Sequence, residues 1–222
     1  MRFALVCFDL DGTLVDSAAD IRAAVAHALT TLPRDEEGDA RALAAAWRGM
    51  PVEELFALAR PRGAADEMRR FVDAYRGYYH AHLVVETRPF PGVAETLAAL
   101  DQRRARGLRA AVATTKRTAT ARALVDGVGL ARHFDLVLGS DGLAYKPAPD
   151  VLLAAARALD RDPRQGVMVG DTERDVAAAR AAGMRACGVT WGALAAAEMR
   201  ALAADWTIDE FRQILPILDG TV

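Results

Sequence analysis

The sequence has very little cysteine and no long hydrophobic run. Cys7 and Cys187 each lie in a short apolar segment, which indicates buried thiols rather than a disulfide framework. The apolar run closest to the start, residues 3–8, is far too short for a signal peptide or a membrane span. We therefore expect a cytoplasmic protein that folds around an ordinary hydrophobic core and has no membrane partner.

The sequence also has little net charge and few aromatic residues. Lys and Arg number 28 against 30 Asp and Glu, the formal net charge is -2, and aromatic residues make up 6%. Such a chain has no overall basic field to hold nucleic acid or an anionic membrane. Its 222 residues, 52% of them hydrophobic, can bury one good core, or one core plus a smaller subdomain.

Short apolar segments typical of buried β-strands recur along most of the chain. Between the later ones lie stretches rich in Ala, Leu and Arg, whose apolar residues have the period of a helix. This alternation favours a Rossmann-like α/β fold, with a parallel sheet covered by helices on both faces. The expected strands are residues 2–8, 109–114, 134–139, 166–170, 185–189 and, more weakly marked, 206–208.

One interval, residues 16–86, breaks this alternation because its pattern is helical throughout. At its start Ser17 and Asp20 have the spacing of a capping box. Further helices are expected over residues 40–47, 52–59 and 65–82. We therefore predict an α/β core formed by residues 1–15 and 87–222, with a smaller all-helical domain inserted after the first strand.

Two carboxylates follow the first expected strand, in the segment FDLDGTL. In an extended segment Asp9 and Asp11 share one face. A turn acid with a helix cap is one alternative, and a calcium loop is another, although Gly12 comes too early for it. Burying two like charges is costly without a compensating cation, and Mg²⁺ accepts carboxylates together with substrate phosphate. The pair is therefore interpreted as a nucleophile and an acid/base group.

Hydroxyl groups and a lysine follow the next two expected strands. Ligands of an open parallel sheet bind beyond the carboxyl ends of its strands. We expect the Thr114 hydroxyl and the Thr115 backbone amide, at a helix start, to donate hydrogen bonds to phosphate. A fixed Lys146 would neutralise a phosphoryl group. The alternatives are an ordinary strand-end threonine and a solvated loop lysine, although Pro147 and Pro149 stiffen that loop.

The fourth expected strand ends in GDTERD, which adds Asp171 and Asp175 to the same edge of the sheet. Thr172 and Asp175 also have the spacing of a capping box for the next helix. The two interpretations are compatible, because a capped helix start also fixes where Asp171 points.

Taken in order, these segments resemble a haloacid dehalogenase superfamily phosphatase with an inserted helical cap. They are most similar to the phosphoglycolate phosphatase group, and the resemblance covers essentially the whole chain. The segments that carry it are DLDGTLVDS (9–17), RPFPGV (88–93), VATTK (112–116), YKPAPD (145–150), GDTERD (170–175) and GVTWG (188–192).

The resemblance implies a mechanism for the two N-terminal acids. Asp9 would attack phosphorus to form an aspartyl-phosphate, and Asp11 would protonate the leaving oxygen and then deprotonate the hydrolytic water. Mg²⁺ would sit on the Asp9 carboxylate, the Asp11 backbone carbonyl and Asp171, while Asp175 holds either metal-bound water or Lys146. Thr115 is a departure, because many close relatives have asparagine there.

The resemblance also bears on phosphoryl and substrate recognition. Thr114, the Thr115 amide and Lys146 would bind the phosphoryl oxygens. Arg48 lies where relatives place a substrate loop of the cap, so it would contact a substrate carboxylate; a solvated arginine is the alternative. The expected activity is Mg²⁺-dependent hydrolysis of a small phosphorylated metabolite, with 2-phosphoglycolate the leading candidate, by a monomer or homodimer.

Other activities stay open at this point. A phosphomutase of the β-phosphoglucomutase type would return the phosphoryl group to a substrate hydroxyl, and a pyrophosphatase or nucleotide phosphatase would use the same groups on another substrate. A noncatalytic descendant that binds phosphate or a protein partner should have lost an essential residue. Asp9, Asp11, Lys146 and Asp171 are all present, which disfavours that reading.

Overall fold

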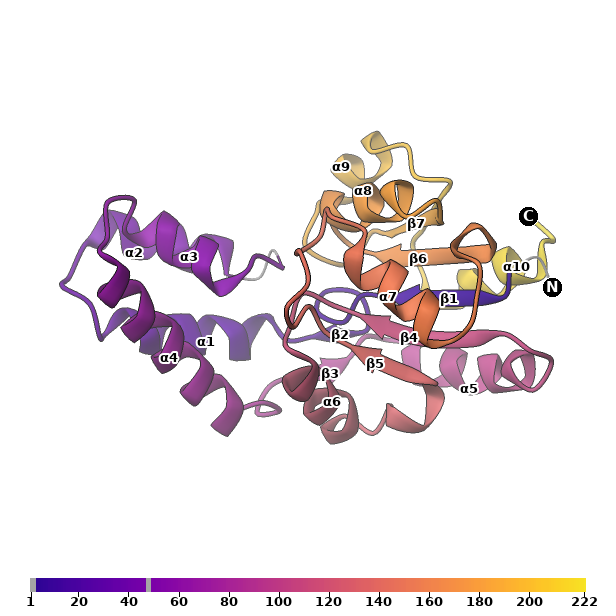
Figure 1. Cartoon of the computed structure of the whole chain (residues 1–222), viewed down its shortest axis with the longest axis horizontal. Helices are drawn as coiled ribbons and strands as arrows, with labels where there is room; N and C mark the ends of the chain where they lie inside the picture. Colours follow the sequence, from indigo (N-terminus) through magenta and orange to yellow (C-terminus); the bar gives the residue numbers. More distant parts are fainter. Residues whose placement is uncertain (1–2, 47–48) are drawn as a thin grey trace. The chain divides into compact units, whose positions relative to one another are not determined.

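The computed structural model describes residues 3–46 and 49–222 (Figure 1). The chain divides into two compact units, a core unit of Met1–Asp16 with Pro89–Val222 and a helical unit of Ser17–Arg88. The sequence placed these boundaries at residues 15/16 and 86/87. The first strand and the rest of the core unit are therefore separated in sequence by the whole helical unit.

The core unit contains a six-stranded sheet in the order β5-β4-β1-β6-β7-β8, and every pair in it is parallel. This arrangement confirms the α/β fold expected from the alternating pattern. The strands are β1 (Leu5–Phe8), β4 (Arg109–Ala113), β5 (Leu136–Leu138), β6 (Gly166–Gly170), β7 (Arg185–Val189) and β8 (Trp206–Ile208).

Helices cover both faces of this sheet (Figure 1). They are α5 (Val93–Arg104), α6 (Thr118–Gly127), α7 (Asp150–Ala158), α8 (Glu173–Ala181), α9 (Ala196–Ala201) and α10 (Ile214–Asp219), with short 3₁₀ helices η1 (Ala131–His133), η2 (Pro163–Gln165) and η3 (Phe211–Gln213). Cys7 of β1 joins a buried cluster with residues of α7 and α8. The next side chain, Phe8, points to the other face, where it packs on Phe211 of η3 with ring centroids 5.5 Å apart.

Within the helical unit lie α1 (Ala18–Leu29), α2 (Glu36–Ala45), α3 (Val52–Ala59) and α4 (Ala65–Ala81). Their apolar faces bury one another; for example, the rings of Phe56 and Phe71 lie 5.8 Å apart. The capping box expected at Ser17 is wrong, because the Ser17 side chain makes no cap hydrogen bond.

Asp20, the expected partner in that box, instead closes the helical unit. Its carboxylate accepts hydrogen bonds from the backbone N–H groups of Val85, Glu86 and Thr87 and from the Thr87 hydroxyl at 2.7 Å. Asp20 is 5% exposed. The first turn of α1 is thereby fastened to the last residues of the unit, a contact of long sequence separation that local spacing does not predict.

Two strands of two residues each, β2 (Val15–Asp16) and β3 (Arg88–Pro89), form a second sheet. The sequence pattern did not predict them, because two residues carry no periodicity. Among the described residues, none of the helices has both the length and the apolar character that crossing a membrane would need.

Candidate active site

The residues that follow β1, β4 and β6 lie together at one edge of the core sheet. Phe8, the last residue of β1, is level with Val112 of β4 on one side and with Val169 of β6 on the other. The next residues of these strands therefore emerge side by side. This register brings Asp9 next to the ends of the strands that carry Thr114 and Asp171.

Lys146 joins two of the carboxylates at this edge. Its Nζ lies 2.6 Å from Asp9 Oδ1 and 2.5 Å from Asp175 Oδ1, and it also donates to the backbone carbonyl of Ala113. Only 3% of Lys146 is exposed. Burial alone would lower the pKa of Lys146, but the Asp175 and Asp9 carboxylates outweigh it and raise that pKa above its ordinary value. The lysine is therefore a buried cation whose charge the two carboxylates stabilise.

Three buried carboxylates, those of Asp9, Asp171 and Asp175, have oxygens within 4.8 Å of one another. Burial raises the pKa of Asp9 to about 7, against the effect of Lys146 and with the help of the Asp175 and Asp11 carboxylates. Burial, followed by repulsion from Asp175 and Asp9, raises the pKa of Asp171 well above its usual range. Asp9 and Asp171 thus resist ionisation with only the protein's own groups present.

A divalent cation fits this donor set. When all three carboxylates of the cluster are ionised and Lys146 is protonated, two negative charges remain uncompensated. The donors are oxygens, which suit a hard cation such as Mg²⁺. Asp9 and Asp171 would hold the cation, as the sequence suggested, whereas both oxygens of Asp175 are already engaged, Oδ1 by Lys146 and Oδ2 by Thr172.

The carboxylate of Asp171 is held in a cradle of small groups. It accepts a hydrogen bond from the Thr13 hydroxyl at 3.0 Å and another from the Ala193 backbone N–H at 2.8 Å. Two glycines let the backbone approach it: a Cβ on Gly12 would lie 2.2 Å from Asp171 Oδ2, and a Cβ on Gly192 would lie 2.2 Å from Asp171 Cβ. The sequence reasoning assigned none of these four residues to Asp171.

Asp175 both caps α8 and contacts the site. Its Oδ2 accepts from the Thr172 backbone N–H and hydroxyl, and the Thr172 side chain accepts in return from the Asp175 N–H, which completes a capping box. Its other oxygen, Oδ1, faces Lys146. Asp175 is therefore both a helix cap and a residue of the site. Its expected partner was either metal-bound water or Lys146, and in the structure it contacts Lys146.

Asp11 forms an ion pair with a residue to which the sequence reasoning assigned no role. Lys116 Nζ lies 3.0 Å from Asp11 Oδ2, and both side chains are 11% exposed. Lys116 stands in the segment VATTK that follows β4. The pairing crosses between β1 and β4, which neighbour each other in the sheet although they are far apart in the chain.

Of the two threonines expected to bind phosphate, Thr114 lies at the end of β4 as predicted, whereas Thr115 does not lie at a helix start. Thr114 is buried, and its hydroxyl oxygen accepts from the Lys116 backbone N–H at 3.2 Å. Thr115 does not lie at a helix start as expected, because α6 begins at Thr118. The N–H of Thr118 is already bonded to the Asp141 carboxylate at 2.6 Å, so that helix start is occupied.

Arg48, the expected substrate contact in the helical unit, lies outside the described residues. The prediction for it therefore stays a prediction.

Comparison with known proteins decides the family. Residues 6–189 match the family model of haloacid dehalogenase-like hydrolases. The chain belongs to this family. Its relatives include the Probable phosphatase IndB of Dickeya dadantii, 39% identical over 95% of this chain and 91% of that protein. A phosphoglycolate phosphatase of Agrobacterium fabrum is 33% identical over 96% of this chain and 91% of its own.

A solved structure agrees with the family assignment. A haloacid dehalogenase-like hydrolase family protein from Streptococcus pneumoniae superposes with a TM-score of 0.82 at 28% identity, covering 97% of this chain and 98% of that one. The resemblance identified from the sequence motifs is thus confirmed, and this haloacid dehalogenase-like chain is an enzyme of the hydrolase class.

Proposed function

We propose that this hydrolase is a Mg²⁺-dependent phosphatase that cleaves a small phosphate monoester through an aspartyl-phosphate on Asp9. The observation that carries the proposal is the Asp9 carboxylate, fixed by Lys146 at the end of the central strand and adjoined by the buried carboxylates of Asp171 and Asp175. A buried carboxylate held next to an ammonium group and a cation-binding cluster suits attack on a phosphoryl group, whose transferred oxygens carry negative charge.

In the first step an Asp9 oxygen attacks phosphorus, and the bond from phosphorus to the ester oxygen breaks. Asp11 donates its proton to that leaving oxygen. In the second step Asp11 takes a proton from water, the water oxygen attacks phosphorus, and the Asp9–phosphorus bond breaks to release inorganic phosphate. Asp11 returns to its starting protonation state, so one carboxylate serves both steps.

The remaining groups stabilise charge and orient the reactants. The Lys146 ammonium offsets charge on the phosphoryl oxygens, and the Thr114 hydroxyl, which accepts from Lys116 N–H, keeps its own proton to donate. When bound to Asp9, Asp171 and the Asp11 carbonyl, Mg²⁺ would neutralise the carboxylate cluster and the phosphate charge. Thr13 and Ala193 hold Asp171 in a fixed orientation for that cation.

The leading substrate is 2-phosphoglycolate. The support is the similarity to relatives such as the phosphoglycolate phosphatase of Agrobacterium fabrum, at 33% identity, together with the resemblance of the sequence segments to that group. We further propose the helical unit as the cap that selects the leaving group, with Arg48 contacting a substrate carboxylate. The cytoplasmic location and the monomeric or dimeric state remain predictions.

A panel of phosphate monoesters tests this function. Phosphate release would be measured from phosphoglycolate, sugar phosphates, nucleoside monophosphates and pyrophosphate, with Mg²⁺ and with EDTA, for the wild type, Asp9→Asn and the surface control Asp126→Asn. We expect Mg²⁺-dependent release that Asp126→Asn retains and Asp9→Asn lacks, with phosphoglycolate preferred. Acid quenching during turnover should trap phosphate on the peptide that contains Asp9.

Two results would contradict the proposal. Folded, Mg²⁺-saturated protein that releases phosphate from no ester would contradict hydrolysis, and transfer of phosphate between sugar phosphates would then favour a mutase. Undiminished phosphate release by Asp9→Asn would contradict the assignment of Asp9 as the nucleophile.

A further inference from the structure

An aromatic cavity lies in the core unit beside the turn that follows β1. It has a volume of about 480 Å³ and is lined by Phe90, Pro91, Gly92, Trp191, Asp209, Glu210, Phe211 and Arg212. This volume is in the range of small-molecule sites. None of these residues belongs to the proposed phosphate chemistry, so the cavity is distinct from the candidate active site.

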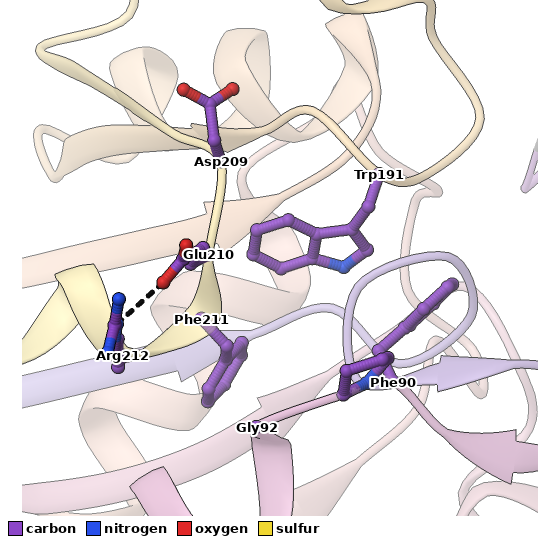
Figure 2. Close-up of a pocket in the computed structure, with 8 residues that line it drawn as sticks. Phe90, Gly92, Trp191, Asp209, Glu210, Phe211 and Arg212 are labelled. Carbon is purple, nitrogen blue, oxygen red and sulfur yellow. Dashed lines mark ion pairs between the residues drawn. The ribbon is translucent and has the colours of Figure 1, made fainter.

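Three aromatic rings form the apolar part of the cavity (Figure 2). The ring centroids of Phe90 and Trp191 lie 6.4 Å apart at 57°, and those of Trp191 and Phe211 lie 6.1 Å apart at 60°. Phe211 is almost fully buried and leans on Phe8 of the central strand. The rings therefore stand on the sheet as a fixed wall, while Trp191 and Phe90 keep part of their surface open.

The charged residues of the lining are two carboxylates and one guanidinium, and each carboxylate is paired with an arginine. Asp209 and Glu210 supply two carboxylates against the one guanidinium of Arg212. Glu210 and Arg212 form an ion pair with side chains 56% and 76% exposed, and Asp209 pairs with Arg200, which does not line the cavity. Exposed pairs of this kind are weak and exchange easily. A cation could therefore replace Arg212 at Glu210 with little loss.

Hydrogen bonds connect the cavity wall to the turn that follows β1, residues 9–14. The Trp191 indole N–H donates to the Thr13 backbone carbonyl at 3.2 Å, and the Phe90 backbone N–H donates to the Leu14 carbonyl at 3.0 Å. Thr13 in turn donates through its hydroxyl to Asp171. An occupant packed against Trp191 and Phe90 thus contacts the side chain and backbone that hold the turn in place.

We propose that this cavity binds a small organic cation with an aromatic or apolar body, and that its occupancy stabilises the cradle of Asp171. Aromatic faces attract cations through their quadrupoles, and the Glu210 carboxylate, whose exposed pair with Arg212 is weak, can accept the charged end of such a ligand. The proposed effect of cavity occupancy on Asp171 rests on the proposed Mg²⁺ site. The proposed binding of an organic cation in the cavity does not.

Binding is tested with three probes of similar size: benzylammonium, benzyl alcohol and benzoate. Titrations of the full chain would be followed by calorimetry and by tryptophan fluorescence. We expect saturable one-to-one binding of benzylammonium, about fivefold tighter than benzyl alcohol, and weaker binding of benzoate. Glu210→Gln should reduce the preference for the cation, whereas Asp126→Asn, which removes an exposed carboxylate from α6, should leave it unchanged.

Coupling is tested by titrating Mg²⁺ calorimetrically with and without saturating benzylammonium. We expect Mg²⁺ to bind about threefold more tightly, or better, when the cavity is occupied, and benzylammonium to bind more tightly by the same factor with Mg²⁺ present. Trp191→Phe keeps an aromatic wall but lacks the indole N–H, so it should still bind benzylammonium and lose the coupling.

The outcomes separate the parts of the proposal. Equal binding of all three probes, or no saturable binding, would overturn the cation site. Binding without any change in Mg²⁺ affinity would overturn the coupling. Because probe binding is measured without turnover, an inactive protein that still binds benzylammonium would contradict the phosphatase function and leave the cavity proposal supported.

Discussion

At the scale of single residues, Lys146 holds together two carboxylates that repel each other. Removing its charge while keeping an apolar stem would leave Asp9 and Asp175 buried without their ammonium partner. We therefore expect Lys146→Met to lower the free energy of unfolding by about 3–5 kcal/mol, measured by urea denaturation at neutral pH. Lys146→Arg keeps the charge and should lose less; equal losses in the two variants would mean that volume, not charge, matters at this position.

Gly12 is required for two separable reasons. Its φ of 81° is strained for any other residue, and a Cβ would lie 2.2 Å from Asp171 Oδ2. Gly129 has a φ of 75° with nothing within 4 Å of such a Cβ, so Gly129→Ala carries only the backbone strain, about 1 kcal/mol. Gly12→Ala should lose more stability than this control and should also lose Mg²⁺ binding by calorimetry. Equal behaviour of the two variants would remove the steric argument.

Asp11 is expected to act on the leaving oxygen and on water. Asp11→Asn should lower kcat for an alkyl phosphate by about 10²–10⁴-fold, the usual contribution of a general acid or base. For p-nitrophenyl phosphate, whose leaving group needs no protonation, the first step should be nearly unaffected, so a burst of nitrophenolate should precede slow turnover. Stopped-flow absorbance measures both phases. Loss of the burst would contradict this assignment, because it would mean that Asp11 does more in the first step than protonate the leaving oxygen.

The site residues differ in how far the sequence could predict them. Asp9, Asp11 and Asp171 were found because carboxylates directly after apolar strands are unusual, and the fold brings strand ends together. Lys146 was found from its place in a proline-stiffened loop after the third expected strand and from the family resemblance. Thr13 was missed because its partner Asp171 lies 158 residues away in the sequence. Lys116 was missed for the same reason, since its contact with Asp11 depends on which strands are neighbours.

At the scale of elements, Asp20 fastens α1 to the end of the helical unit. Burial alone would raise the pKa of Asp20, but hydrogen bonds from Thr87, Glu86 and Val85 outweigh it, so that the pKa is lowered from 3.8. A carboxyl with a lowered pKa stabilises the fold fully above pH 3.8, and this contribution is lost as the pH falls through the folded-state value.

Asp20→Asn should therefore destabilise the helical unit by about 1–3 kcal/mol at pH 7. Hydrogen exchange of the α1 and α4 amides measures this locally, with the core strands as internal reference. The difference from wild type should stay constant down to about pH 4 and shrink below it, because the variant does not titrate there. A stability difference between wild type and variant that grows on acidification would contradict a stabilising role of the ionised Asp20 carboxylate.

Elements were predictable where a periodic pattern coincided with burial. The runs at β6, β7 and β8 were predicted with the bounds that the structure has. β6 and most of β7 are buried, whereas β8 is a half-buried edge strand, in keeping with its weaker sequence signal. The run at β1 was expected to begin earlier than Leu5, since apolar character continues before the strand does. The capping box at Ser17 failed because Asp20 found stronger partners 65 to 67 residues away.

At the scale of the whole molecule, cation binding should appear as thermal stability. A ligand that binds only the folded state at about 100 times its Kd adds roughly 2.7 kcal/mol, which corresponds to about 2–4 °C per kcal/mol for a domain of this size. Scanning calorimetry should show Mg²⁺ raising the Tm of the core unit, and EDTA reversing the rise. Asp171→Asn should abolish the effect and Asp126→Asn should retain it; a Mg²⁺ shift that survives Asp171→Asn would place the cation elsewhere.

The position of β1 in the sheet has a consequence for synthesis on the ribosome. β1 is translated before the other strands of the sheet, yet its two neighbours are β4 and β6, which begin at Arg109 and Gly166. At about 5–20 residues per second, the buried sequence Leu-Val-Cys-Phe waits several seconds for its first partner strand. Meanwhile the helical unit, whose chain is continuous, can already fold. The nascent chain therefore carries an apolar strand without its sheet neighbours, on the N-terminal side of a helical unit that can already be folded. Such a segment is of the kind that chaperones engage.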